Sequence, residues 1–302
     1  MDPQDILRLD NIWEYCDLFN QPASHPLVGV IDFSKSKPCR HQRHLFNFYV
    51  LFLKEVKCGD LIYGRHTYDY QEGTVVAIAP GQIAGCVDDG TTFQPKGYAL
   101  LFHPDLIHGT QLARQMKDYT YFSYESREAL HLSEKERETY MQCLKKIQEE
   151  TQAPIDRHTR KIIVATLEVL LDHLLRFYER QFQTRAAANH DVLTRFEQLL
   201  TEYYDNTTVQ QRDGLPTVKY FADHLFLSAN YFGDLVKKET GQSPRDYIQR
   251  KIIDVAKERV LNPSSNISNV AYELGFRYPQ HFTRLFKKVT GQTPQQYRQG
   301  LA

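Results

Sequence analysis

The sequence predicts an α+β protein, in which a β-rich N-terminal part precedes a helical segment and an all-α C-terminal part with two tandem helix-turn-helix units. Three observations predict this. Short β-forming runs alternate with Gly, Pro and Asp turns up to about Ser126. Ser133 and Glu136 then have the spacing of a capping box, and helical patterns follow almost to the end. An internal repeat occupies the last third of the chain.

We expect the N-terminal part to form an antiparallel β sandwich or barrel. Its β-forming runs are residues 27–31, 45–53, 74–79, 98–102 and 119–124. Several aromatic side chains in this part could line a ligand cavity or form ordinary core, and ordinary core is the preferred interpretation. They are Tyr49, Phe52, Tyr63, Phe93 and Tyr98. The sequence does not identify an effector.

The helical segment contains a long run, residues 155–188, without Gly or Pro and with a broad apolar stripe. The preferred interpretation is that this helix packs against the sheet domain alone. The alternative is a homodimer interface that also uses Leu174, Phe177 and Tyr178. Another amphipathic helix follows at residues 190–204, and a polar run separates it from the next. We expect domains at 1–130, 131–188 and 189–302.

Composition predicts an ordinary globular protein with a basic C-terminal end. The 302 residues are 41% hydrophobic, which is ample for two cores, and the formal net charge is +0. That balance hides an asymmetry, because ten basic residues face four acidic ones between Ser243 and Ala302. Phosphate binding depends on such Lys and Arg excess.

The five cysteines form no C-x-x-C pair, which is typical of a reducing compartment. They are Cys16, Cys39, Cys58, Cys86 and Cys143. No secretory signal pattern opens the sequence, and no apolar stretch is long enough to span a bilayer. We therefore expect a cytoplasmic protein without a membrane partner.

The internal repeat aligns residues 231–247 with residues 281–297 at one constant offset, with nine identical positions. In each copy, apolar residues at i, i+3 and i+4 form the buried side of a helix. Gly241 and Gly291 supply the left-handed residue that commonly ends a helix. Ser243-Pro244 and Thr293-Pro294 then start a new helix at once, as N-cap and first helical residue.

A short helix precedes each copy, so each forms a helix-turn-helix whose second helix would enter a major groove. The connecting helix runs from Ser243 to about Asn262, and Pro263 ends it. At about 1.5 Å per residue, roughly twenty residues span about 30 Å. Successive major grooves on one face of DNA are roughly 34 Å apart, so one chain could place both helices on one duplex.

These residues carry a family resemblance. The stretch from about His190 to Arg298 resembles the DNA-binding domain of AraC/XylS transcription regulators, most specifically at residues 267–276 and 282–298. The resemblance implies a sequence-specific regulator, with double-stranded DNA and the transcription machinery as partners. It implies no catalytic residues and no cofactor.

Helical geometry and the resemblance together give the expected DNA-binding residues. On the first recognition helix these are Asn230, Gly233, Asp234, Lys237 and Lys238, and on the second they are Gln280, Thr283, Arg284, Lys287 and Lys288. Gln suits an adenine edge, Arg a guanine edge, and lysines near helix ends meet phosphate. An ordinary solvated helix face is the alternative for the lysines.

The first motif departs from its partner at two points. Asp234 stands where the second motif has Arg284, and it either accepts a hydrogen bond from cytosine N4 or pairs with a neighbouring lysine. Phe226 stands where the second motif has Gly275, so we expect the first turn to differ in shape.

By its position, the β-rich part resembles the cupin-like sensor domain of many such regulators, which implies a small-molecule effector. Gly97, Pro104 and His108 resemble a degenerate second cupin motif, but the usual His-x-His upstream is missing. His103 and His108 could ligate a metal with a third histidine, although hydrogen-bonded surface or core histidines are commoner. The candidates for that third ligand are His41, His44 and His66. We expect no metal. A cupin-type metal enzyme with a helical appendage is the alternative function.

Overall fold

The computed structural model describes residues 6–55, 61–63, 66–68, 73–85, 90–125, 128–205, 214–262 and 265–301, with only the backbone described at 61–63, 66–68, 186–188, 205 and 301. Cys58, Cys86 and Pro263 lie outside the described residues, as do the side chains of Tyr63 and His66. The chain divides into two compact units, 1–184 and 185–302. The finer expected division, with boundaries at 130 and 188, stays a prediction.

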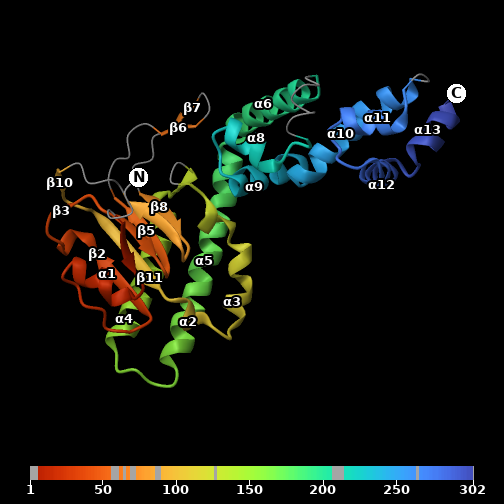
Figure 1. The fold of residues 1–302 in the computed structure, drawn as a ribbon. Coiled ribbons are helices and arrows are strands. Elements are labelled where there is room, and N and C mark those ends of the chain that lie inside the picture. The colour runs from red at the N-terminus through yellow and green to blue at the C-terminus, as the bar shows by residue number, and fades with distance from the viewer. Residues whose placement is uncertain are drawn as a thin grey trace. The chain divides into compact units, whose positions relative to one another are not determined.

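The N-terminal unit is built on a five-stranded antiparallel sheet with the strand order β12-β8-β5-β11-β2 (Figure 1). Its strands are β2 (Val28–Asp32), β5 (Tyr49–Lys54), β8 (Thr74–Ile78), β11 (Gly97–Phe102) and β12 (Leu130–His131). A second sheet joins β1 (Ile6–Leu9), β4 (Arg43–Phe46) and β9 (Gln82–Gly85). Two small ribbons pair β3 (Cys39–Arg40) with β10 (Thr92–Phe93) and β6 (Leu61–Tyr63) with β7 (His66–Tyr68).

Alternation along β5 divides the core into two layers. Leu51 and Leu53 belong to the cluster that includes α4 (Glu134–Gln152) and α5 (Thr159–Thr184). Val50 and Phe52 point the other way, toward the second sheet and α1 (Ile12–Leu18). This is the pleat of a strand buried on both faces. The described strands form a layered sandwich of separate sheets rather than a closed barrel. The cupin-like character of this part stays a prediction.

Residues 119–124 were expected to be a strand, and the structure corrects this. They form the single-turn 3₁₀ helix η4 (Thr120–Ser123), preceded by the short α2 (Pro104–Ile107), α3 (Gln111–Gln115) and 3₁₀ helix η3 (Met116–Asp118). The neighbours Tyr121 and Phe122 are both buried in the same cluster, which the alternation of a strand does not permit. The Tyr121 hydroxyl donates to the Leu171 carbonyl on α5.

The helical layer follows the expected pattern at its start. Ser133 accepts a hydrogen bond from the Glu136 amide while the Glu136 carboxylate accepts one from the Ser133 amide, so the predicted capping box opens α4. Leu174, Phe177 and Tyr178 of α5 are buried in the core of their own unit. These three residues are therefore unavailable for the subunit interface that the sequence offered as an alternative.

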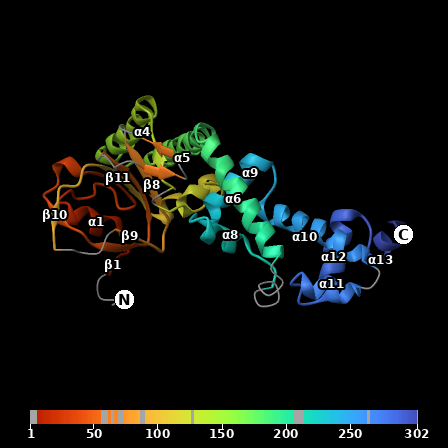
Figure 2. The ribbon, with the colours of Figure 1, turned by 90° about the horizontal axis from the view of Figure 1, so that it is seen from above.

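The C-terminal unit is all-helical. Its helices are α6 (Ala186–Asp205), α8 (Val218–His224), α9 (Ala229–Thr240), α10 (Pro244–Leu261), α11 (Ile267–Glu273), α12 (Pro279–Thr290) and α13 (Pro294–Leu301). Within this unit α10 runs between two helical groups, with α6, α8 and α9 at one end and α11, α12 and α13 at the other (Figure 2). No helix among the described residues is long and apolar enough to cross a membrane.

Candidate nucleic-acid interface

The two recognition helices, α9 and α12, begin and end at residues that favour helix termini. The Ser228 hydroxyl caps α9 by accepting from the Tyr231 amide, and Pro279 occupies the first turn of α12. Both helices end at a left-handed glycine, Gly241 with φ 71° and Gly291 with φ 80°. Each glycine amide donates to the carbonyl four residues earlier, which closes the last turn. We name α8 with α9 the first motif and α11 with α12 the second motif.

The buried sides of α9 and α12 fix how each helix is rotated about its axis. In α9, Phe232 meets Phe196 of α6 edge to face, with ring centroids 5.0 Å apart. In α12, Phe282 meets Phe276 at 5.3 Å, and Phe286 meets Tyr297 of α13 at 5.4 Å. These aromatic contacts hold the opposite, polar side of each helix outward.

The connecting helix α10 carries both motifs. Its buried side chains are Pro244, Ile248, Ile252, Ile253, Ala256 and Val260. They contact helices of both motifs, including α9 and α12. The 18 residues of α10 span about 27 Å, close to the expected length. Near the start of α10, burial and the neighbouring Glu197 carboxylate raise the pKa of Tyr247 to about 12, so this hydroxyl stays protonated and donates to Glu197.

The structure places the expected DNA-binding residues on the outer sides of α9 and α12. Side chains of both helices are exposed at Asn230, Lys237, Lys238, Gln280, Arg284, Lys287 and Lys288. Gly233, Asp234 and Thr283 are half-buried. None of these residues turns into the core. Their contact with DNA stays a prediction.

Charge differs between the two outer sides. The α12 helix carries Arg284, Lys287 and Lys288 and no acidic residue. The α9 helix carries Lys237 and Lys238 but also Asp234 and Glu239, so its formal charges cancel. The second motif is therefore the better suited to phosphate.

The two turns differ in length, because the second is one residue longer, but they begin with the same backbone conformation. Phe226 has φ 57° and Gly275 has φ 85°, so both turns use a left-handed residue at the same place. The Leu227 amide donates to Ala222 at 2.9 Å, and the Phe276 amide donates to Ala271 at the same distance. The backbone at the start of the turn is thus retained in the first motif even though a phenylalanine replaces the glycine.

Space around the turn explains the two residue choices. A Cβ at Gly275 would lie 2.5 Å from the Gly214 carbonyl oxygen, so only glycine fits beside that segment. Phe226 is 67% exposed, so its side chain finds room in solvent. The sequence could not reveal this difference, because Gly214 is distant from Gly275 in the chain.

Sequence reasoning missed three arginines of the C-terminal unit. Arg259 donates to the Tyr204 carbonyl at the end of α6, at 3.0 Å. Arg298 donates to the Val260 carbonyl at the end of α10, at 2.6 Å, and to Ser265 at 2.7 Å. Each of these two arginines therefore binds a carbonyl in the last turn of a helix. Arg277 is exposed directly before α12, where the second turn is one residue longer than the first.

The aromatic residues that could have lined one cavity in the N-terminal unit lie on different faces. Tyr49 and Tyr98 pack against the helical layer, whereas Phe52 faces the second sheet. Phe93 is partly exposed and stacks on His41 at 4.3 Å. These side chains therefore do not enclose a common ligand cavity.

The histidines considered as metal ligands have other contacts. The His103 ring accepts from the Asp105 amide at 3.2 Å and so caps α2, and His41 stacks on Phe93. Burial lowers the pKa of His44 to about 4. In the part of the chain that the structure describes, no three His, Cys, Asp or Glu side chains gather to hold a metal ion.

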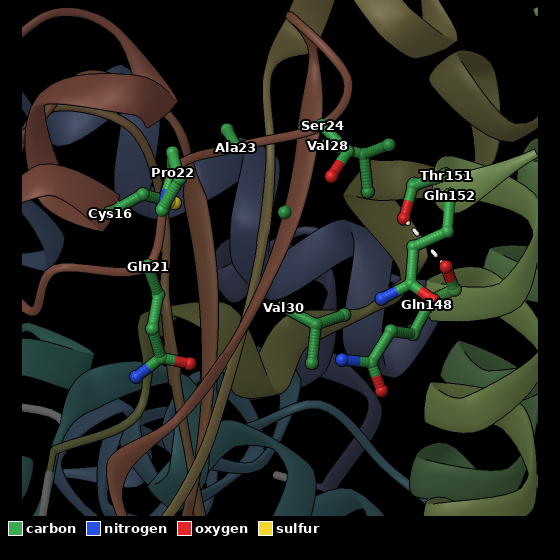
Figure 3. A pocket seen from close by; sticks show the side chains of 11 residues that line it. Cys16, Gln21, Pro22, Ala23, Ser24, Val28, Val30, Gln148, Thr151 and Gln152 are labelled. Carbon is green, nitrogen blue, oxygen red and sulfur yellow. Dashed lines mark hydrogen bonds between the residues drawn. The ribbon is translucent and has the colours of Figure 1, made fainter. Parts of the chain in front are cut away.

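A hollow in the N-terminal unit lies between β2, the loop that precedes it and the C-terminal end of α4 (Figure 3). It encloses about 530 Å³, including its open mouth. Figure 3 shows Gln148 and Gln152 reaching from α4 toward the strand that carries Val28 and Val30. Burial raises the pKa of Cys16 in its wall to about 12, so that thiol stays neutral.

Comparison with known proteins identifies the kind of domain at the C-terminal end of the chain. A family model described as a helix-turn-helix domain matches residues 221–300. The chain is 37% identical over 78 residues to the uncharacterized transcriptional regulatory protein YesN of Bacillus subtilis, covering 25% of this chain and 21% of that one. It is 28% identical over 137 residues to the HTH-type transcriptional activator RhaS of Citrobacter koseri, covering 45% and 47%.

Among solved structures, the C-terminal domain of the response regulator yesN from Fusobacterium nucleatum is 26% identical, with a TM-score of 0.32. The match covers 36% of this chain and 98% of that domain. This chain spans less than half the length of the first curated relatives that it matches. The duplicated motif and the matched helix-turn-helix model together show that the C-terminal unit carries a helix-turn-helix domain of the AraC type.

Proposed function

We propose that this chain is a sequence-specific regulator of transcription that binds double-stranded DNA through α9 and α12. One observation carries the proposal. Two copies of a recognition helix, joined by α10, keep their polar sides exposed, and the α12 side carries three cations without an acidic residue. A helix with this arrangement suits a major groove, and cations near its end suit phosphate.

The test is a DNA shift titration with the full chain. Binding should weaken as salt rises, with a slope of log K against log salt close to −0.9 per phosphate neutralised. Enrichment of a random-sequence duplex library should yield a defined site. The triple variant Arg284→Ala, Lys287→Ala, Lys288→Ala, checked for an unchanged melting temperature, should lose most of the affinity. Binding without any sequence preference would contradict the proposal.

The chain's partners in this proposal include the transcription machinery, because the relative RhaS is named a transcriptional activator. A promoter that carries the enriched site should change its transcription when the full chain is supplied in a purified system. Substitution of Arg284 should abolish that change. An unchanged transcript level with full occupancy of the site would remove this part of the proposal.

We include a homodimer, which the outward stripe of α5 supports. Ile162 is 45% exposed and Val169 is 50% exposed. Seven residues separate them, so they lie on one side of the helix, with Ala165 between them. Sedimentation should detect a dimer that Ile162→Glu with Val169→Glu dissociates, while Lys145→Glu on α4 leaves it intact. A monomeric wild-type chain would contradict this part.

We also infer control by a small neutral molecule in the hollow of Figure 3. None of the side chains that line it is charged: the polar ones carry amide, hydroxyl and thiol groups, and Val28 and Val30 add apolar surface. Such a lining suits a polar, uncharged ligand with several hydrogen-bonding groups. A screen of neutral polyols and amides by thermal shift should find compounds that stabilise the wild-type chain but not Gln148→Ala. Stabilisation by charged compounds alone would contradict the inference.

The rival function is a cupin-type metal enzyme. It requires a metal cage, and the described residues offer none. Metal analysis of the purified chain separates the two functions, because stoichiometric iron, nickel or manganese would favour the enzyme.

A further inference from the structure

We propose that α9 selects its base pair through a gap at Gly233, where the helix backbone itself approaches the groove, and that the carboxylate of Asp234 accepts a hydrogen bond from a cytosine there. This inference rests on the proposed function and deepens it, because it assigns the first motif to base selection and the second motif to anchoring.

The described part of the C-terminal unit gives no structural reason for the glycine. Gly233 lies inside α9, on its outer side, and has no positive φ that a side chain would resist. A Cβ built at Gly233 meets nothing within 4 Å. Glycine inside a helix destabilises it relative to alanine, because it gains more freedom in the unfolded chain. The fold would therefore accept alanine, and the missing side chain leaves space for a partner.

The equivalent position in the second motif sharpens this point. Thr283 occupies it in α12, with a half-buried side chain. The α12 helix therefore meets any partner with side chains, whereas α9 can meet one with its backbone surface. A close approach at Gly233 would bring the adjacent Asp234 to the base edges.

Asp234 already has a contact within the protein, but a carboxylate has several acceptor sites. Beside phosphates it is an unfavourable residue unless it also accepts a specific hydrogen bond from DNA. In the major groove the donors are the exocyclic amines of cytosine and adenine. Adenine also presents its N7 acceptor, which an amide side chain satisfies better than a carboxylate does. A carboxylate that only accepts therefore matches cytosine, and it is repelled by the acceptors of guanine and thymine.

The experiment compares three full-length variants with the wild type on duplexes that the wild type enriches from a random-sequence library. Gly233→Ala should retain or raise the melting temperature and weaken binding of the selected duplex about tenfold, as one lost base-pair contact does. The matched control is Gly300→Ala, since Gly300 lies in α13 and a Cβ there also meets nothing within 4 Å. This control should leave affinity unchanged. Asp234→Asn should enrich adenine where the wild type enriches cytosine.

Different results would contradict this proposal and the proposed function. If Gly233→Ala binds the selected duplex as tightly as the wild type, the gap at Gly233 has no role in binding. If Gly233→Ala lowers the melting temperature, the fold itself requires the glycine and the premise of the proposal is wrong. If Asp234→Asn enriches the same base as the wild type, Asp234 is an intrahelical partner rather than a reader. In both cases the wild type still selects a site, so the proposed function stands. Failure of the wild type to select any site would overturn the proposed function itself.

Discussion

The turns of the two helix-turn-helix motifs begin with the same left-handed residue and differ in what surrounds it. In the second motif Gly275 is held against the Gly214 backbone, where no side chain fits. In the first motif the equivalent Phe226 is exposed, so nothing but its own backbone strain opposes the side chain. The motif therefore requires a left-handed residue in the turn, whereas it requires glycine only where another segment covers that residue.

The two motifs also differ in the side chains on the outer sides of α9 and α12. The second motif presents Thr283 and Arg284 where the first presents Gly233 and Asp234. The second motif therefore has larger and more basic side chains on its groove-facing side. The two copies keep most packing positions and the paired lysines at the end of each helix, whereas Gly233 and Asp234 differ from Thr283 and Arg284.

The largest expected effect is at the confined turn. Gly275→Ala places a Cβ against the Gly214 carbonyl and forces a left-handed alanine. Left-handed strain and backbone overpacking together should lower the free energy of unfolding by about 2–4 kcal/mol. Chemical denaturation monitored by circular dichroism measures this. As a control, Gly291→Ala carries the same strain without the clash, because a Cβ there meets nothing within 4 Å, and it should cost less. Equal losses would show that Gly214 does not confine the turn.

How much of this could be foreseen differs between the two units. In the C-terminal unit, the helix caps at Ser243, Gly241 and Gly291 depend on local sequence, so the sequence predicts where the helices begin and end. The exposure of the groove-facing residues follows from the same periodicity. The confinement of Gly275 depends on a segment far away in sequence, and no local pattern carries it.

In the N-terminal unit the same limit appears at residues 119–124. Alternating aromatic and polar residues favour a strand, but Tyr121 and Phe122 both pack into the core that α5 covers. Tertiary contact with Leu171 therefore decided the local structure. The division of Tyr49 and Phe52 between two layers, in contrast, follows from their odd separation within one strand, so the strand predicted at 45–53 already implies it.

The second prediction concerns Arg284, the clearest difference between the groove-facing sides. Arg284→Ala should weaken binding of the selected duplex by about 1–3 kcal/mol and relax the preference at one base pair, because a bidentate contact to guanine is lost. Competition shift assays with single-base variants of the site measure both. Equal losses on selected and random duplexes would show that Arg284 contacts phosphate and reads no base.

The third prediction concerns Phe226, the left-handed residue in the turn of the first motif. Phe226→Gly should raise the free energy of unfolding by about 1 kcal/mol, because it relieves left-handed strain that glycine does not feel. Phe226→Ala keeps the strain and removes only an exposed ring, so it serves as the matched control and should change stability little. A loss of stability in Phe226→Gly would mean that the phenylalanine ring contributes packing that outweighs the strain.

The smallest expected effect separates phosphate binding from helix stabilisation. Lys237 and Lys287 occupy the last turns of α9 and α12, where a cation stabilises a helix of either motif by about 0.3–1 kcal/mol without any DNA. If both also meet phosphate, Lys237→Ala and Lys287→Ala should each lower the salt slope of DNA binding by about one and weaken all sequences alike. Titrations at several salt concentrations measure this slope. A reduced slope for Lys287→Ala alone would show that only the second motif lies along the DNA backbone. Unchanged slopes in both variants would show that these lysines only stabilise the helix ends and do not contact phosphate.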